Sequence, residues 1–554
     1  MLLFSLQGAA SVLAAQWQAN TGPAGAALGA IVGGDVERYL RAASLAGVIP
    51  QVPWAARPYG SRELKQFFLD STVRAHPWRS ELQRSLARRT ATGTIGFSSI
   101  NSAFPWGSND GAIWQGRGIN LAIGVAAAFH WGALSVVAAP LAYSSQNASF
   151  RLQRPIVAGV SPYADPLLPT AVDLPQRMGS RPYTRLDPGE SSIRMRLKGA
   201  EIGVSSASEG WGTGEAFPAI LGANAGGFPH LFFGASGRGV HLDGIGDFKA
   251  RYVLGLLDQS AWSRVQGSET YRNSEESGTR RIGSGVSVGY SPSFLAGLEV
   301  GASRFFHSPY RAGRHGWNAW SKPFEGIFKQ GFNGRTDDTG DPGGDSDNQL
   351  AAFFARWAFP RRGIEATIEV FRDDHSWDSR DFAQEPENNS AVLASIRTTV
   401  HRDADRLALL TFEYFDGDVR PIAQARAQAF LYAHTPLRQG HTQRGQLLGA
   451  PIGAGAIAGA RSTWEQFTPT GSFRVNLQRW RTRSTPSTDP QGLLPAAGSA
   501  VPNSHDWILE ASAAATRYRS RRTLSLEAGV AWAGRWQLSE AKTNFFTRAS
   551  LGMF

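Results

Sequence analysis

Residues 351–371 have the sequence AAFFARWAFPRRGIEATIEVF, and this stretch decides the fold. Apolar side chains occupy every second position from Ala351 to Phe359 and again from Ile364 to Val370. The four residues 360–363, Pro-Arg-Arg-Gly, separate the two runs and are typical of a turn. A period of two on both sides of a turn predicts an antiparallel hairpin with one apolar and one mixed face.

The same alternation recurs along most of the chain. It is clear at residues 282–290, 294–300 and 524–532, and it begins near residue 93. The 62 glycines, 30 prolines and 18% charged residues suit strands that are separated by many turns. We therefore predict an all-β fold, a large antiparallel transmembrane β-barrel spanning residues 93–554.

Residues 121–143 allow a second interpretation. The stretch is almost entirely apolar and is long enough for a transmembrane helix. Its larger side chains nevertheless alternate from Leu121 to Phe129, and His130-Trp131-Gly132 suits a tight turn. We expect two strands here in place of a helix.

Cations alternate with apolar residues in the segments 192–199, 248–252 and 473–478. One Arg or Lys on the lipid face near the membrane midplane costs about 2–4 kcal/mol, so several together must face the lumen. A soluble sandwich with cationic outer faces would fit each segment taken alone. The cations expected in the lumen are Arg194, Arg196, Lys198, Lys249, Arg251 and Arg474.

Composition narrows the class of partner. The net charge is +11, but no long basic run accounts for it, so we expect no nucleic-acid binding. Distributed positive charge favours an acidic partner, such as an anionic polysaccharide or lipopolysaccharide. The 17 tryptophans suit either the aromatic girdles of a membrane barrel or a surface that stacks on sugar rings. The chain has no cysteine, which is compatible with an exported protein.

The two ends of the chain suggest export and membrane insertion. Residues 1–15, MLLFSLQGAASVLAA, resemble the apolar core of a secretory signal, although a basic start is missing. Residues 35–90 predict a periplasmic helical segment of three short helices, the first with Asp35 as its N-cap. The terminal Phe554 closes an amphipathic strand and resembles the signal that barrel-assembly machinery recognises.

Two clusters are candidate polysaccharide contacts. Asp373, Asp374, His375 and Trp377 follow a strand and could bind a sugar, act as acid and base, or form a solvated loop. Arg314, His315, Trp317 and Trp320 could stack on sugars and pair with acidic groups, or belong to a girdle or a lumen plug.

No catalytic, metal or cofactor site is predicted. The acidic run at residues 337–347 resembles a calcium loop in composition, but its spacing does not fit one, so a flexible surface loop is the better interpretation.

Several segments together resemble the Wzi-type capsule assembly protein family, in order along about residues 35–554. In EGWGTG, Gly210 and Thr213 stand where the family usually has the first of two tryptophans and a proline. The segments are DGAIWQGRG (110–118), DLPQR (173–177), LDPGESSIRMRLKG (186–199), EGWGTGEAFPAILGANAGGFPHLFF (209–233), EVFRDDHSWDSRDFAQEP (369–386) and LRQGHTQRGQLLG (437–449).

The resemblance implies a barrel of about eighteen strands in the Gram-negative outer membrane, with a small periplasmic helical bundle. It also implies a lectin-like monomer that binds capsular or other exported polysaccharide at the cell surface and is not an enzyme. Two alternatives stay open. The basic lumen suits a channel for anionic solutes, and the carboxylates near Asp373 suit an exported carbohydrate-active enzyme.

Overall fold

The computed structural model describes residues 21–263, 280–310, 318–325, 347–373, 379–384, 389–417, 431–434, 437–484, 506–536 and 540–554. The hairpin predicted at 351–371 is confirmed as β15 (Asn348–Phe359) and β16 (Ile364–Asp373). Gly363 ends the turn between them at φ +69°. The expected signal at residues 1–15 lies outside the described residues.

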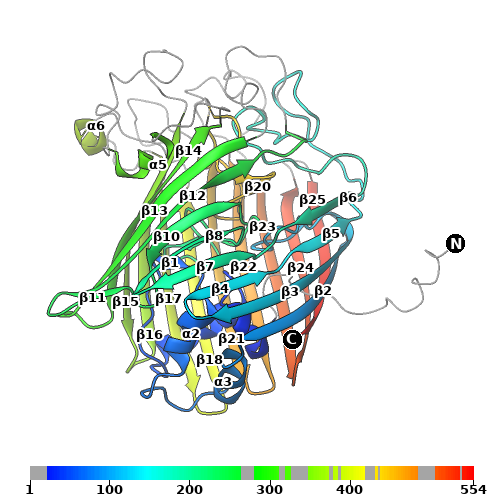
Figure 1. The fold of residues 1–554 in the computed structure, drawn as a ribbon. Helices are drawn as coiled ribbons and strands as arrows, with labels where there is room; N and C mark the ends of the chain where they lie inside the picture. The colour runs from blue at the N-terminus through cyan, green and yellow to red at the C-terminus, as the bar shows by residue number, and fades with distance from the viewer. Residues whose placement is uncertain are drawn as a thin grey trace.

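The described strands form a closed antiparallel barrel of eighteen strands (Figure 1), which confirms the predicted fold class. Three of these strands are interrupted and carry two labels each: β4 with β5, β6 with β7, and β10 with β11. The remaining barrel strands are β2 (Thr90–Asn101), β3 (Gly118–Trp131), β8 (Ala200–Ser205), β12 (Gly246–Asp258), β13 (Arg280–Pro292), β14 (Leu298–Pro309), β17 (Ser390–Arg402), β18 (Leu407–Gly417), β21 (Ala456–Thr468), β22 (Gly471–Ser484), β23 (Asp506–Arg519), β24 (Arg522–Trp536) and β25 (Glu540–Met553). The interrupted ones are β4 (Leu134–Ala138), β5 (Leu141–Ser145), β6 (Tyr183–Asp187), β7 (Ser192–Leu197), β10 (His230–Ala235) and β11 (Val240–Leu242).

The wall follows the alternation of the sequence. Along β3, Leu121, Ile123 and Val125 are more than half exposed on the outer face, whereas Ala122 and Ala126 between them are buried. Large apolar side chains therefore cover the outside of the barrel, where they suit contact with lipid. No helix among the described residues is both long and apolar enough to span a membrane.

The first and last barrel strands close the ring. β2 pairs with β25 from Thr94↔Met553 to Asn101↔Phe546. Phe554 is buried in a small apolar cluster that includes Ile95 and Phe97 of β2. The expectation that Phe554 follows the closing strand is thus confirmed, while its recognition by assembly machinery stays a prediction.

Three short helices occupy one end of the barrel, which we call the helix end (Figure 1). They are α1 (Asp35–Leu45), α2 (Ser61–Phe68) and α3 (Arg79–Leu86), preceded by η1 (Pro23–Leu28). Tyr39 and Trp78 stack at 4.0 Å and meet Phe467 of the wall edge-on. The helices therefore pack inside the wall and do not form a separate body. The predicted N-cap was wrong: Gly34 caps α1, and Asp35 instead pairs with Arg38.

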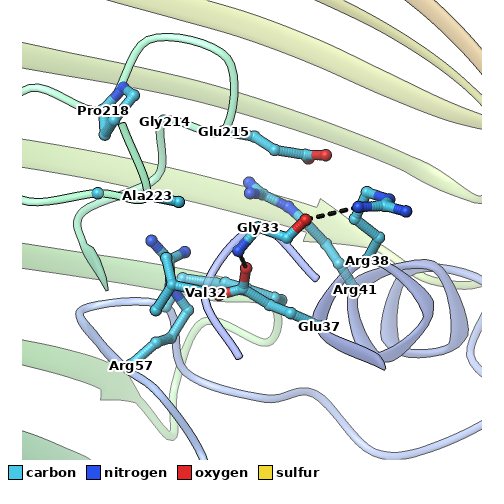
Figure 2. Close-up of a pocket in the computed structure, with 12 residues that line it drawn as sticks. Val32, Gly33, Glu37, Arg38, Arg41, Arg57, Gly214, Glu215, Pro218 and Ala223 are labelled. Atoms are coloured by element: carbon cyan, nitrogen blue, oxygen red, sulfur yellow. Dashed lines mark hydrogen bonds and ion pairs between the residues drawn. The ribbon is translucent and has the colours of Figure 1, made fainter. Parts of the chain in front are cut away.

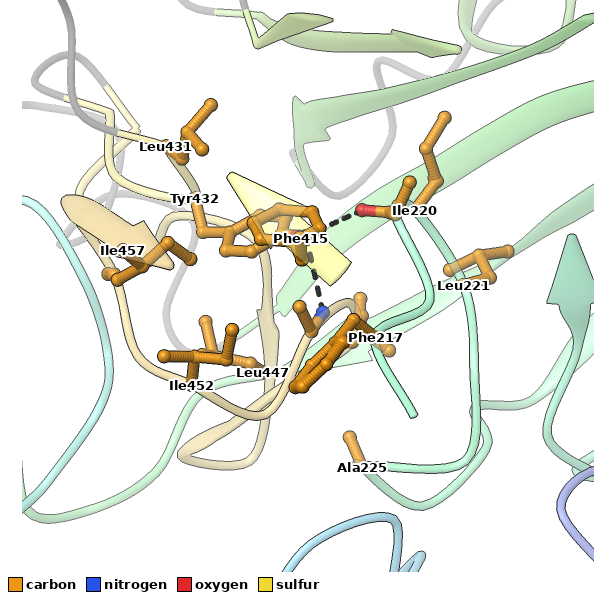
Figure 3. Packing of buried hydrophobic residues seen from close by; sticks show 14 of the residues in the cluster. Phe217, Ile220, Leu221, Ala225, Phe415, Leu431, Tyr432, Leu447, Ile452 and Ile457 are labelled. Carbon is orange, nitrogen blue, oxygen red and sulfur yellow. Dashed lines mark hydrogen bonds between the residues drawn. The ribbon is translucent and has the colours of Figure 1, made fainter. Parts of the chain in front are cut away.

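Four lumen segments fill the barrel beyond the helices: residues 102–117, 164–178, 206–229, and 431–434 with 437–455. Their buried side chains form one apolar cluster with inward-facing wall residues, such as Phe217 against Phe415 (Figure 3). Tyr432 donates its hydroxyl proton to Ala219 O at 2.7 Å and accepts from Ala450 N at 3.2 Å. Lumen segments from distant parts of the sequence are thereby locked to one another.

Two local expectations need correction. Residues 121–143 form strands as predicted, but β3 runs through Trp131 and the turn falls at Gly132, where φ is +48°. Pro140 then interrupts the return between β4 and β5, because proline cannot donate to the ladder. Residues 294–297, expected to begin a strand, belong to the turn before β14, and Phe294 is 79% exposed.

Candidate functional site

Trp320, the described residue of the first predicted sugar contact, lies on the outer side of the wall. Trp320 belongs to α5 (Asn318–Ser321), which is followed by η3 (Lys322–Phe324). Its carbonyl accepts from the Tyr252 hydroxyl at 2.8 Å, and the Phe324 ring stacks on Tyr252. The other members of this patch, Arg314, His315 and Trp317, lie outside the described residues.

The described residue of the second predicted contact, Asp373, is buried and holds a lumen segment. Asp373 ends β16 and is 2% exposed, and its Oδ2 accepts from Tyr432 N at 2.5 Å. The carboxylate thus holds a lumen segment and does not lie in a surface loop, because β16 continues through Asp373. Asp374, His375 and Trp377 lie outside the described residues.

The cations expected in the lumen occupy three kinds of position. Lys249 and Arg251 are buried inside the barrel, while Arg194 and Arg196 are half-buried on the inner face of β7. Arg474 is buried and lines a cavity next to α1. Lys198 differs, because it lies beyond the end of β7 in a turn at φ +43° and is exposed.

Carboxylates neutralise the most buried of these cations. Arg251 pairs with Glu209 at 2.5 Å and with Glu201 at 2.6 Å. Burial raises the pKa of Glu209, but Arg251 and His230 outweigh it and bring that pKa to about 2. Lys249 donates to Ala235 O at 2.7 Å and lies 3.7 Å from Glu63. These charges hold the lumen segment and α2 in place, so they are not free to line an anion path.

A tryptophan pocket lies towards the end of the barrel opposite the helices, and it encloses about 1100 Å³ of empty space when its opening to solvent is included. β22 and β24 leave the helix end at Gly471 and Arg522, and Trp480 and Trp536 lie near their far ends. The pocket's tryptophans are Trp106, Trp114, Trp480 and Trp536, and its polar side chains are Asp165, Gln176, Asn224 and Gln446.

Packing fixes the orientation of the rings. Trp106 and Trp480 contact each other at 4.7 Å with their planes 42° apart, and Trp536 stacks on Phe104 at 3.9 Å. The indole Nε1 of Trp106 donates to Glu510 Oε2 at 2.7 Å. Trp114 is half-buried and lies over Gly116, where a Cβ would overlap its ring. The aromatic walls are therefore preformed.

The polar side chains of the pocket join the lumen segments together. Asn224 Oδ1 accepts from Asn109 N at 3.2 Å, and its Nδ2 donates to Leu447 O at 2.9 Å. Asp165 Oδ1 accepts from the backbone N–H groups of the two leucines at 167–168. Within the described residues, no hydrogen bond occupies Asp165 Oδ2 or Gln446 Oε1, so these oxygens can accept from a ligand hydroxyl.

The pocket combines tryptophan ring faces with oxygens that can accept a hydrogen bond from a hydroxyl group. This combination is suited to a sugar ring, which has apolar faces and a polar edge. The sequence analysis did not single out this pocket. Trp106 and Trp114 come from the loop between β2 and β3, whereas Trp480 and Trp536 lie near the far ends of β22 and β24, so no local spacing groups the four. The signal in the sequence was the high number of tryptophans and the position of Trp114 in the segment 110–118.

Comparisons with known proteins place the chain among barrels of this kind. A family model described as capsule assembly protein Wzi matches residues 106–547. The fold is similar to a solved structure from Escherichia coli, described as Wzi, an outer membrane protein involved in group 1 capsule assembly and a carbohydrate-binding β-barrel. The two share 13% identity with a TM-score of 0.63, over 95% of this chain and 99% of that one.

Other matches are more distant. The outer membrane protein OprD of Pseudomonas aeruginosa matches with 8% identity and a TM-score of 0.39, over 84% of this chain and 93% of that one. OccD3 of the same organism matches with 10% identity and a TM-score of 0.38, over 84% and 90%. No curated protein matches the chain.

Proposed function

Because this chain belongs to the capsule assembly protein Wzi family and is a β-barrel of the Gram-negative outer membrane, we propose that it binds capsular or other exported polysaccharide and retains it at the cell surface. The observation that carries this proposal is the tryptophan pocket, with its preformed aromatic faces and hydroxyl acceptors. The role is that of a lectin-like anchor and not of an enzyme.

Orientation supports this assignment. An even number of strands returns the wall to the end where it began, and β25 closes on β2 beside the helices. In the proposed topology these helices face the periplasm, so the tryptophan pocket lies towards the outside. Lipopolysaccharide contact through the outer wall, insertion by barrel-assembly machinery and a monomeric state are further parts of the proposal.

The pocket suits binding better than hydrolysis. Glycosidases generally use a pair of carboxylates that flank the scissile bond. Among the described residues that line the pocket, Asp165 is the sole carboxylate, and one of its oxygens is held by backbone N–H groups. The channel alternative is weakened because the lumen segments form a packed apolar core across the barrel.

The test is a binding titration with the purified full chain in detergent. Polysaccharide from the producing strain is added while tryptophan fluorescence is followed, with a neutral dextran as the comparison. Trp114→Ala removes a half-buried ring, and we expect affinity to fall at least tenfold, which corresponds to about 1.4 kcal/mol.

Trp357→Ala is the matched control, because its ring is 41% exposed on the outer wall and should leave the affinity unchanged. Equal affinity of wild type and Trp114→Ala for the producing strain's polysaccharide would remove the pocket from the proposal. Deleting the gene should release polysaccharide into the medium, and unchanged surface retention would overturn the anchor role itself.

A further inference from the structure

A second cavity lies between α1 and the wall on the helix-end side of the tryptophan pocket, with about 870 Å³ of empty space when its opening to solvent is included. We call it the arginine chamber. Ser108, Asn109, Glu215 and Ala216 of the lumen segments also border it. Its charged lining residues are Arg38, Arg41, Arg397, Arg461, Arg474, Glu215, Glu413 and Glu465.

Most of these charges are paired. Arg38 lies 3.0 Å from Glu465 and 2.5 Å from Asp35, and Arg41 lies 2.9 Å from Glu365 behind the lining. These pairs hold α1 against the wall. Figure 2 shows Arg38 and Arg41 of α1 facing Glu215 in the smaller pocket that adjoins the chamber.

Arg397 forms ion pairs with the two other carboxylates of the chamber, Glu413 and Glu215. It lies 3.1 Å from Glu413 and 3.8 Å from Glu215. Each of the three carboxylates of the lining therefore already has an arginine partner.

Arg461 differs from Arg38, Arg41 and Arg397, because no carboxylate of the described residues lies within ion-pair distance of it. Its one hydrogen bond within the described structure runs from NH2 to Asn476 Oδ1 at 2.8 Å, and it makes no ion pair there. Its Nε is buried and has no hydrogen-bond partner among the described residues. Partial burial of a guanidinium costs free energy when no anion lies beside it, and its fork of N–H groups matches a planar oxyanion.

Solvent reaches the chamber, so a small ion can enter it. The Glu215 side chain is 34% exposed, and Thr411, Arg461 and Thr463 are half-buried. The partition from the tryptophan pocket is thin, because Gly107 borders that pocket whereas Ser108 and Asn109 border the chamber.

Because Arg461 makes no ion pair, its Nε has no hydrogen-bond partner among the described residues and solvent reaches the chamber, we propose that the arginine chamber binds a small oxyanion, a carboxylate or a phosphate. Arg461 donates to it from β21, and Arg474 on the adjacent strand β22 adds its positive charge. The inference goes beyond the proposed function and does not depend on polysaccharide binding at the tryptophan pocket.

The experiment measures thermal unfolding of the purified full chain during titration with sodium glucuronate, sodium phosphate or sodium chloride at matched ionic strength. Glucose serves as the uncharged comparison for glucuronate. We expect a saturable rise in Tm with glucuronate, with phosphate or with both, and none with chloride or glucose. A rise with one alone identifies the anion as carboxylate or phosphate.

Arg461→Gln should raise the apparent Kd for the oxyanion at least tenfold. Arg461→Lys keeps the positive charge but loses the fork of N–H groups, so it should raise the Kd less. Arg517→Gln, an exposed wall position, and Trp114→Ala should both leave it unchanged. If Arg461→Gln fails to fold, the titration of the wild type still tests whether an oxyanion binds. Absence of a saturable rise with both oxyanions, or undiminished binding by a folded Arg461→Gln, would overturn the proposal.

Discussion

His307 Nε2 and His441 Nδ1 lie 2.7 Å apart inside the barrel, so one hydrogen bond joins strand β14 of the wall to a lumen segment. His441 Nε2 donates to Ile220 O at 2.6 Å, which leaves its Nδ1 as the acceptor. Arg281 donates to His307 Nδ1 at 3.2 Å and to the carbonyls of Gly440 and Thr442. The chain of bonds works only when both imidazoles are neutral.

This network predicts that acid loosens the lumen segment at residues 437–447. Burial lowers the pKa of His441 to about 3, against about 6.5 in an unfolded chain. Between these values the unfolded state binds the extra proton, so stability falls as pH drops below 6.5. The loss is about 1.4 kcal/mol for each pH unit, or roughly 2 kcal/mol at pH 5.

The measurement is protease sensitivity of the segment from pH 7.5 to 5, compared between wild type and His441→Gln. The comparison is needed because Glu190, whose pKa burial raises to about 7, changes stability in the opposite direction. A wild type and a variant with the same pH slope would contradict the assignment to His441.

Glu209 gives a second prediction. It accepts from Arg251 Nε at 2.9 Å, and Arg251 also lies over the Phe232 ring at 3.9 Å. Glu209→Gln leaves a buried guanidinium with Glu201 as its remaining carboxylate, which should lower the free energy of unfolding by about 3 kcal/mol. Glu81→Gln, which breaks the exposed pair with Arg84, should cost under about 1 kcal/mol. Equal effects of the two substitutions on Tm would refute this account.

The strands of the wall could be predicted from the sequence, because apolar and polar side chains alternate within each strand, as they do from Ala351 to Val370. The interior could not. Trp106 and Trp480 touch although they lie far apart in the chain, so no local pattern relates the two rings. Asp373 was mistaken for a surface residue for the same reason: its partner, Tyr432, comes from a distant lumen segment.

Gly212 carries the third prediction, within the segment where the chain departs from its family's usual sequence. It lies at φ +76°, and an added Cβ would overlap the Glu369 carboxylate. That carboxylate accepts from Thr213 N at 2.9 Å, a bond that the family's usual proline could not donate.

Gly212→Ala should therefore cost the strain of a positive φ, about 1–2 kcal/mol, and about 1–3 kcal/mol more for the overlap. Gly132→Ala is the matched control, because Gly132 has a positive φ but nothing within 4 Å of the added Cβ. Thermal unfolding of the two variants separates the strain of the positive φ from the overlap with the Glu369 carboxylate. Equal values of Tm would show that the structure relieves this overlap.

The last prediction concerns conductance and separates the anchor from the channel. The apolar cluster between Phe217 and Tyr432 should block ions, since water and ions are excluded from a close-packed core. In a planar bilayer the wild type should give no steady current. Removing residues 212–222 deletes one side of the cluster while retaining β8 and β10, and this variant should conduct. Removing residues 240–245 deletes β11 and the exposed turn that joins it to β12, and it should leave the barrel closed because β10 keeps its own pairing with β12. A persistent anion-selective current through the wild type would instead favour transport, because a packed core cannot carry it.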